Sequence, residues 1–451
     1  MAIVIEICEI LKSRLHLADF DNRVTALMRQ VLSQSLTEAL ERLDKEIIQS
    51  YLADGWEINR LEVRQLTFLF GTVSFHRRRL RKAGEKSFVP LDEAIGLKPR
   101  ERYSPSFHEK VSLLATGMTY RQASSSLRLL TGIEMSHQGI HNLVQRVGEK
   151  LLSSQDVPET TELRRPDYLF IEGDGVWIGS QEKGKHLELK RGHIHEGVGR
   201  HGGRGELMNP VYFSYFGTSK DLFQQMSDYM ASHYDLSKTI VIANSDGGSG
   251  YEASKFEDML GRHKSFAYCL DAYHVMKCIT GQLSFDKHLL QAVRASVKAY
   301  DSDQLAVHLD TAESVIEDEK QLDKLLAVRS YLESHWEAIK PLRLRHLGVT
   351  SGVGTCEGGH RFYSYRLKKQ GRNWRESGVS HIVAIMTAQK NGTFEALYRC
   401  STPYQPFNDE IDVNMRQVLR KMPHDPHRIP QARIVLTGAT SSPVGQLKKW
   451  I

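Results

Sequence analysis

Two aspartates, each followed by glycine, come after apolar segments and are the first candidates for chemistry. Asp174 lies within IEGDGVWI and Asp246 within NSDGGSGY. Carboxylates that share a cleft repel each other, so they stay ionised together only when divalent cations neutralise them. Oxygen ligands favour Mg²⁺ or Mn²⁺, and two such ions ~4 Å apart stabilise the attacking and leaving oxygens of a phosphoryl displacement. The alternative interpretation is that both aspartates belong to ordinary Asp-Gly turns.

A two-metal site needs a third carboxylate, and the candidate is Glu357. It lies in GVGTCEGGHRFYSYRLKKQGRNW, residues 352–374, after a glycine-rich turn. His360 follows three positions later, so on a helix it would share a face with Glu357 and support the site. The predicted metal ligands and catalytic residues are therefore Asp174, Asp246 and Glu357. If the first of these is wrong, its replacement is Glu172, which would point to the same face of a strand.

The segment after Glu357 is basic and aromatic, as expected of a surface that contacts nucleic acid. Its cations would approach the phosphates of a DNA backbone, and its aromatic side chains would be available for stacking. The predicted DNA-binding cations are Arg361, Arg366, Lys368, Lys369 and Arg372. The predicted stacking residues are Tyr363, Tyr365 and Trp374.

Three histidines resemble a second metal cluster. His193 and His195 would point to one face of a strand, and His201 follows in a glycine-rich stretch. No third ligand stands at a clear spacing from the first two. We therefore expect these histidines to be structural or to face DNA.

The elements that would position these residues alternate between strands and helices. Apolar segments within 165–179, 187–199, 209–217, 239–251 and 265–277 predict strands, and 219–234 predicts a helix. Three strands that could form a meander, followed by strands reached through helices, are the order of the ribonuclease-H-like fold. In such a sheet the strands that carry Asp174 and Asp246 are neighbours. Residues 280–345 are almost wholly helical and indicate a helical insertion.

Two upstream features predict contact with DNA. Residues 66–82 predict a hairpin or strand around Gly71 that ends in an arginine run, and these arginines would contact phosphates. They are Arg77, Arg78, Arg79 and Arg81. Two helices within 118–151 are separated by a turn at Gly132, with Ser136 as N-cap, which is the pattern of a helix-turn-helix motif. The residues that would reach base edges are His137, Gln138, His141 and Asn142. The alternative is a plain helical hairpin.

Composition and charge limit the classes of protein. The chain has 451 residues, of which 40% are hydrophobic and 25% charged, as in a globular protein of several domains. Five cysteines form no CxxC pair, which disfavours a disulfide scaffold and favours a reducing cytoplasm. No apolar run is long enough for a membrane span, so we expect no membrane partner. The net charge of +6 sums an acidic stretch at 301–340 and basic stretches at 76–86, 341–390 and 415–451, which favour a polyanion partner.

Four segments in this order, IEGDGVWI, NSDGGSGY, LDAYHVMK and CEGGHRF, resemble the bacterial insertion-sequence transposases of the ISLre type. That group was first classed as an uncharacterised protein family and is distantly similar to the Mutator-like transposases. The resemblance covers about residues 60 to 400 and implies that the Asp-Asp-Glu triad falls on Asp174, Asp246 and Glu357. It implies that Asp271 and His274 support the site; the alternative is a helix N-cap with a packed histidine. In the turn after Asp246 a pattern nearer Gly-Ala-x-aromatic is expected, and Tyr251 would fill the aromatic position.

The resemblance further implies cleavage and strand transfer at inverted-repeat ends of double-stranded DNA, with Mg²⁺ or Mn²⁺ as the cofactor. It also implies a homo-oligomer on DNA, located in the cytoplasm at the nucleoid. The predicted fold class is α/β: a ribonuclease-H-like catalytic domain with a helical insertion, preceded by a mainly helical DNA-binding region. A nuclease of the same fold and a domesticated, non-catalytic DNA-binding protein remain the alternatives. The predicted segments are 1–65 (helical), 66–102 (basic strand or hairpin), 103–160 (helix-turn-helix), 161–279 and 346–400 (catalytic core), 280–345 (insertion) and 401–451 (basic tail).

Overall fold

The computed structural model describes residues 2–13, 15–153, 162–201 and 204–400. The chain divides into two compact units between Ser104 and Pro105, two residues after a predicted segment boundary. The predicted basic tail, 401–451, lies outside the described residues. Within the described part of the chain, none of the helices has the length and apolar composition needed to cross a bilayer.

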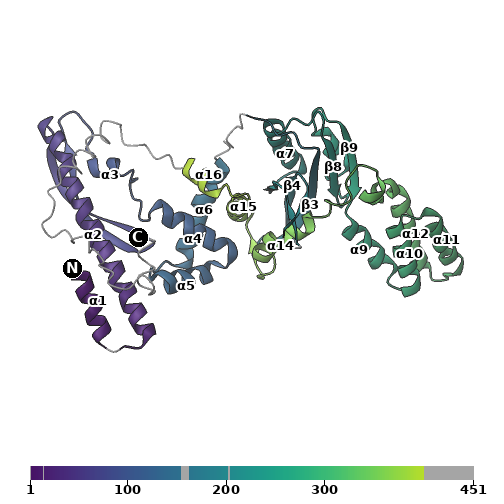
Figure 1. The fold of residues 1–451 in the computed structure, drawn as a ribbon, viewed down its shortest axis with the longest axis horizontal. Helices are drawn as coiled ribbons and strands as arrows, with labels where there is room; N and C mark the ends of the chain where they lie inside the picture. Colours follow the sequence, from purple (N-terminus) through teal and green to yellow (C-terminus); the bar gives the residue numbers. More distant parts are fainter. Residues whose placement is uncertain (1, 14, 154–161, 202–203, 401–451) are drawn as a thin grey trace, which may run out of the picture. The chain divides into compact units, whose positions relative to one another are not determined.

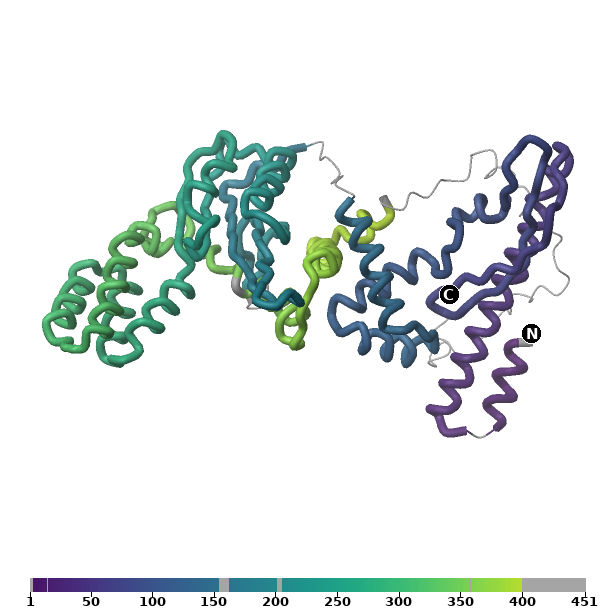
Figure 2. Tube along the Cα trace, turned by 180° about the vertical axis from the view of Figure 1, so that it is seen from behind, coloured from purple at the N-terminus to yellow at the C-terminus, as the bar shows by residue number. Residues whose placement is uncertain are grey.

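The first unit packs a long helix against a β-hairpin (Figure 1, Figure 2). Its elements are α1 (Ala2–Lys12), α2 (Leu17–Ala53), β1 (Glu57–Phe68), β2 (Gly71–Arg81) and α3 (Pro90–Ala94). Val73 and Phe75 of β2 are fully buried and pack with Leu40 of α2. The predicted helical region to residue 65 is therefore too long: α2 ends before Gly55, which adopts a positive φ of 82°, and β1 begins two residues later.

The second unit begins with a helical region that contains the predicted helix-turn-helix. Its helices are α4 (Pro105–Gly117), α5 (Tyr120–Thr131) and α6 (His137–Ser153). Thr119 and Gln122 form a capping box at the start of α5, and Gly132 ends that helix at a φ of 72°. The Ser136 hydroxyl accepts a hydrogen bond from the backbone N–H of Gly139 at 3.1 Å, which confirms it as the N-cap of α6. Both predicted helices and the turn between them are present.

A mixed sheet forms the centre of the second unit. Its strands are β3 (Tyr168–Ser180), β4 (His186–His195), β7 (Val211–Tyr215), β8 (Ile240–Ser245), β9 (Ser265–Leu270) and β10 (Asn373–Trp374). The order is β7-β4-β3-β8-β9, and β10 pairs with the end of β3. β4 is antiparallel to β3 and β7, whereas β8 and β9 run parallel to β3. The predicted meander followed by parallel strands is thus confirmed.

The two faces of this sheet differ in chemistry. One face is apolar and packs against α7 (Ser219–His233) and α8 (Ala253–Asp258). The opposite face carries the polar residues of β3 and β4 and meets α14 (Cys356–Leu367). A further antiparallel pair, β5 (Val198–His201) and β6 (Arg204–Leu207), forms a small separate sheet in the glycine-rich stretch that contains His201.

A bundle of helices between β9 and α14 confirms the predicted helical insertion (Figure 1). It comprises α9 (Ala272–Leu283), α10 (Lys287–Ala299), α11 (Ser302–Val315), α12 (Glu319–Ser334), α13 (Trp336–Ile339) and the 3-10 turn η1 (Leu342–Leu344). These helices have a hydrophobic core separate from that of the sheet, and Leu270 at the end of β9 packs into it.

Asp286, Asp301 and Asp318 cap three of these helices by accepting backbone N–H groups, which explains part of the acidic composition. After α14 the unit closes with α15 (Glu376–Lys390) and α16 (Phe394–Cys400).

Candidate functional site

The register of the parallel strands brings the two predicted aspartates together. Gly173 of β3 pairs with Ser245, the last residue of β8, so Asp174 and Asp246 come next on neighbouring strands. β9 ends at the same level, and Asp271 follows it directly. Asp174 lies in the middle of β3, which excludes the turn interpretation for that residue. The Asp246 carboxylate accepts the backbone N–H of the residue two positions on, as in an Asx turn.

Asp174, Asp246 and His274 form a cluster suited to a metal ion. One ligand atom from each residue lies within 4.8 Å of the others. Asp271 caps α9 by accepting the backbone N–H of His274 at 3.0 Å, and its Oδ1 lies 3.2 Å from the imidazole Nδ1. Burial favours the neutral acid, yet the hydrogen bonds from His274 lower the pKa of Asp271. The same contact raises the pKa of His274 against the effect of burial. The structure therefore pairs Asp271 with His274 and also places His274 beside the two carboxylates.

A buried chain of three side chains fixes the orientation of Asp174. Oδ2 of Asp174 lies 2.5 Å from Nε2 of His360, and Nδ1 of His360 lies 2.5 Å from Nη1 of Arg191. Arginine can only donate, so Nδ1 must accept and Nε2 carries the proton that His360 donates to Asp174. Arg191 is fully buried, and its guanidinium lies 4.5 Å from the ring centroid of Tyr363. Arg191 was not among the predicted site residues, although it stands opposite Asp174 in the β3–β4 register.

Tyr251 occupies the aromatic position expected after the second aspartate. Its ring is buried, and its hydroxyl donates to the backbone carbonyl of Asp174 at 3.1 Å. Burial raises the pKa of Tyr251, so the phenol stays protonated and remains a donor. The turn that departs from the expected pattern therefore still delivers an aromatic side chain beneath Asp174.

Glu357 is the second residue of α14, and its side chain lies outside the part of the chain that the structure describes. The alternative carboxylate, Glu172, is not placed as a catalytic residue would be, because it is enclosed in the protein and bound to backbone N–H groups. It is fully buried and accepts the backbone N–H groups of Thr355 and Cys356, each at 2.8 Å on Oε2. Glu172 thereby caps the start of α14, where a negative charge is favourable.

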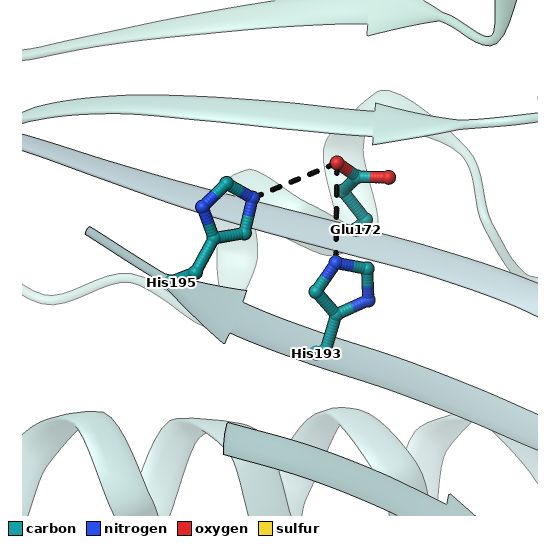
Figure 3. Close-up of side chains that lie close together, drawn as sticks. All are labelled: Glu172, His193 and His195. Carbon is teal, nitrogen blue, oxygen red and sulfur yellow. Dashed lines mark ion pairs between the residues drawn. The ribbon is translucent and has the colours of Figure 1, made fainter. Parts of the chain in front are cut away.

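His193 and His195 lie beside Glu172 rather than on a surface (Figure 3). Their Nε2 atoms are 3.9 and 3.7 Å from Oε1 of Glu172, and both side chains are buried. Burial lowers the pKa of His193 well below its ordinary value, so the imidazole is neutral. Of the two expected roles for these histidines, contact with DNA is excluded because both are buried, and burial agrees with a structural role. The side chain of His201 lies outside the described residues.

The arginine run of β2 is largely engaged in ion pairs within the first unit. Arg77 is buried and pairs with Glu62 and Asp92. The other ion pairs are Arg78 with Asp44 at 2.6 Å, Arg79 with Glu62 at 2.7 Å and Arg81 with Glu57 at 3.2 Å. Phosphate contact by Arg77 is excluded by its burial; among the four, only Arg81 has a mostly exposed side chain, at 62%.

Some of the cations predicted to bind DNA in α14 and just after it are exposed, and one is buried. Arg361, Lys368 and Lys369 are exposed, and Arg372 is partly exposed. Arg366 is fully buried, donates from Nε to the carbonyl of Ala115 and lies over the rings of Tyr120 and Trp374. Burial lowers the pKa of Arg366 to about 10. The prediction that Arg366 contacts DNA is therefore wrong.

The predicted stacking residues divide in the same way. Tyr363 and Trp374 are buried, so neither can stack on a base. Tyr365 is 56% exposed and lines a cavity of about 650 Å³ with Arg361 and Phe362.

The predicted base-reading positions of α6 form one polar group. His137, Gln138 and Asn142 are exposed and His141 is partly exposed. Nε2 of Gln138 donates to Oδ1 of Asn142 at 2.9 Å, and the ring of His141 meets Tyr120 edge-on. On its opposite side, α6 packs on α15, where Gln145 bonds to the carbonyl of Gly378 and to His381. The second unit thus holds this polar group on a helix anchored to the sheet region.

Fold and site together define a mixed α/β protein with a helical insertion and a buried carboxylate–histidine site on one sheet face. The chain belongs to the uncharacterised protein family UPF0236, whose family model matches residues 10–400. It is 64% identical over 451 residues to the UPF0236 protein in vanSb 3'region of Streptococcus gallolyticus, with 100% of both chains covered. UPF0236 protein TTE2489 of Caldanaerobacter subterraneus subsp. tengcongensis is 21% identical over 389 residues, which covers 85% of this chain and 81% of that one.

Among solved structures, a simian T-cell lymphotropic virus intasome in complex with PP2A regulatory subunit B56 gamma matches 47% of this chain and 69% of that chain. The sequence identity is 14% and the TM-score is 0.15, which is too low to indicate a shared fold.

Proposed function

We propose that this protein is a DNA transposase: a metal-dependent enzyme with a ribonuclease-H-like catalytic domain that cleaves DNA at insertion-sequence ends and joins the freed ends to target DNA. The observation that carries the proposal is the cluster of Asp174 within β3, Asp246 directly after β8 and His274 in the first turn of α9. The strand order, an antiparallel meander followed by parallel strands, agrees with the proposed fold.

The donor set of this cluster fits a divalent cation. Carboxylate oxygens suit Mg²⁺ and Mn²⁺, and an imidazole nitrogen is better tolerated by Mn²⁺. Asp174 and Asp246 would hold the metal, and we expect Glu357 to supply a third carboxylate. When bound, such ions lower the pKa of water and stabilise charge on a phosphate.

The chain's own residues orient the reacting groups. His360 donates to Oδ2 of Asp174 while Arg191 holds the imidazole, so the carboxylate keeps one orientation. His274 would be a third ligand, and the contact of its Nδ1 with Asp271 would hold the ring in place. Hydrolysis of the phosphodiester at the insertion-sequence end frees a 3′-hydroxyl, which then attacks a target phosphodiester at the same site.

DNA would be bound by the exposed members of the predicted set. Gln138 and Asn142 on α6 would reach base edges. Arg361 on α14, with Lys368 and Lys369 directly after it, would contact phosphates. Tyr365 and the cavity it lines could accept an unstacked base. Because two ends are joined in one reaction, we expect a homo-oligomer on DNA.

The test uses the full-length protein and labelled duplexes that carry the sequences flanking its gene. Wild-type protein with Mg²⁺ or Mn²⁺ should nick these duplexes at one position and join the 3′ ends to a plasmid. Asp246→Asn should lose both activities by at least about 1000-fold, and Asp258→Asn, an exposed aspartate on α8, should keep them. Cleavage without joining would indicate a nuclease. DNA binding without cleavage by the wild-type protein would contradict the enzymatic proposal.

A further inference from the structure

Glu172, His193 and His195 form a second cluster of possible metal ligands on the polar sheet face. Ligand atoms of the three residues all lie within 4.8 Å of one another, and the three side chains are at most 1% exposed. Figure 3 shows both imidazoles directed at one carboxylate oxygen, at 3.9 and 3.7 Å. The cluster contains neither Asp174 nor Asp246, so it is separate from the proposed catalytic site and does not depend on it.

Two ring nitrogens of this cluster have no hydrogen-bond partner among the residues that the structure describes. They are Nε2 of His195, which faces Oε1 of Glu172, and Nδ1 of His193. Nδ1 of His195 is occupied instead, because it lies 3.1 Å from the carbonyl oxygen of Gly197 and 3.2 Å from the backbone nitrogen of the same residue. A buried polar atom without a partner is rare and costs free energy, and a metal ion bound to Nε2 of His195 would remove that cost. In His193 the nitrogen turned to Glu172 is Nε2, so the metal would bind there and would leave Nδ1 as it is. When Nδ1 of His195 donates to that carbonyl, Nε2 is left with a lone pair directed at the cluster.

The carboxylate is held in the orientation that a metal ligand needs. Oε2 of Glu172 accepts two backbone N–H groups at the start of α14. Oε1 accepts the N–H of Thr355 at 3.1 Å and is the oxygen that both imidazoles face. The Thr355 hydroxyl donates to Oε1 of Glu172 at 2.8 Å, so it accepts from Nε2 of His193, also at 2.8 Å. Zinc would take the place of the proton on that nitrogen. Hydrogen bonds to the outer oxygen of a ligand carboxylate, here Oε2, are a regular feature of metal sites.

We propose that Glu172, His193 and His195 bind one zinc ion, with the Thr355 hydroxyl or a water in the fourth position. Two imidazoles and one carboxylate are an established ligand type for zinc. Ligand atoms about 2.0–2.1 Å from a tetrahedral ion are ~3.4 Å apart, so the observed separations need to close by only about half an ångström. The ion would fix the start of α14 to β3 and β4. Since His360 lies in the second turn of α14, the zinc would position the partner of Asp174 without touching DNA.

The experiment measures zinc bound to the full-length protein in excess Mg²⁺. We expect about one equivalent of zinc after desalting. His195→Gln should lower zinc affinity at least about 100-fold, in line with the loss of a ligand. Asp174→Asn should leave the affinity within about threefold, and so should His233→Gln, which removes a buried histidine on α7. Loss of zinc in Asp174→Asn but not in His195→Gln would overturn the proposal.

X-ray absorption of the zinc-loaded wild-type protein identifies the zinc ligands without the need for a variant that folds. The spectrum should show nitrogen and oxygen ligands only, with outer-shell scattering from two imidazoles. The Asp174 cluster has one histidine, so a single imidazole would place the zinc there and overturn the assignment. A wild-type protein that binds no zinc at micromolar concentration would overturn it as well.

Discussion

Nε2 of His360 lies 2.5 Å from Oδ2 of Asp174, although 186 positions separate the two residues in the chain. The contact joins the middle of β3 to the second turn of α14, and the whole helical insertion lies between them in sequence. Because Arg191 donates to the other ring nitrogen, His360 can only donate to the carboxylate. The orientation of the central aspartate therefore depends on where α14 begins.

Substitution of His360 should weaken metal binding at the Asp174 cluster. His360→Leu removes the donor to Oδ2, and loss of such an orienting partner lowers metal affinity about 10–100-fold. His360→Gln keeps an N–H donor of similar reach and should stay within a few-fold of wild type. Mn²⁺ binding followed by electron paramagnetic resonance measures both. Equal affinity in the leucine variant and the wild type would contradict the orienting role.

Glu172→Gln should destabilise the protein by about 2–4 kcal/mol in the presence of a chelator. The neutral amide turns one acceptor into a donor, which then opposes the backbone N–H groups of Thr355 and Cys356. Urea unfolding measures the change. Thr355→Val removes only the hydroxyl contact, and in a double-mutant cycle it should couple to Glu172→Gln. Additive effects of the two substitutions would show that the hydroxyl contact contributes nothing.

The pairing of Asp174 with Asp246 could be predicted because both follow apolar strand segments of a recognisable order. β3 and β8 start at the same level, so Asp246, directly after the shorter β8, lies beside Asp174 within the longer β3. The second cluster could not be predicted from spacing, since Glu172 comes from the strand opposite His193. Only the antiparallel register between β3 and β4 reveals the third ligand.

The arginine run illustrates the opposite error. A cluster of like charges in the sequence suggested a phosphate-binding surface, but its partner carboxylates lie on β1, α2 and α3. A run of like charges in the sequence gives the charge of one segment only. The opposite charges that pair with it can come from distant segments that packing brings beside it. Arg366 was misjudged for the same reason, because its stem and guanidinium pack between aromatic rings.

Gly148→Ala should disrupt the packing of α6 on α15. A Cβ at Gly148 would lie 2.4 Å from the backbone oxygen and the Cβ of His381, and backbone atoms cannot move aside without shifting a helix. We expect destabilisation of about 1–3 kcal/mol by thermal or urea unfolding. Gly281→Ala in α9 is the matched control, since nothing lies within 4 Å of the added atom. That control should be neutral or stabilise by up to about 1 kcal/mol.

Acid should destabilise the second unit through His108. Burial lowers the pKa of His108 to about 4, so the unfolded chain takes up a proton near pH 6.5 that the folded chain accepts only near pH 4. Stability from this residue is complete above about pH 6.5 and falls by up to about 3 kcal/mol as the pH decreases to 4. Urea unfolding of wild type and His108→Gln across this range isolates the contribution. Identical pH slopes for the two proteins would refute it.

Substitution of Gln138 and Asn142 should separate sequence-specific from non-specific DNA binding. Both side chains are exposed on the first turns of α6, and amides in that position discriminate bases by about 1–3 kcal/mol for each good contact. The double alanine variant should lose about 10-fold or more in affinity for gene-flanking duplexes and little for random duplexes, as measured by fluorescence anisotropy. Glu149→Ala, exposed on the same helix, should not lower affinity for either duplex. An equal loss on both duplexes in the double variant would mean that α6 contacts the phosphate backbone and does not read bases, because phosphate contacts carry no sequence information.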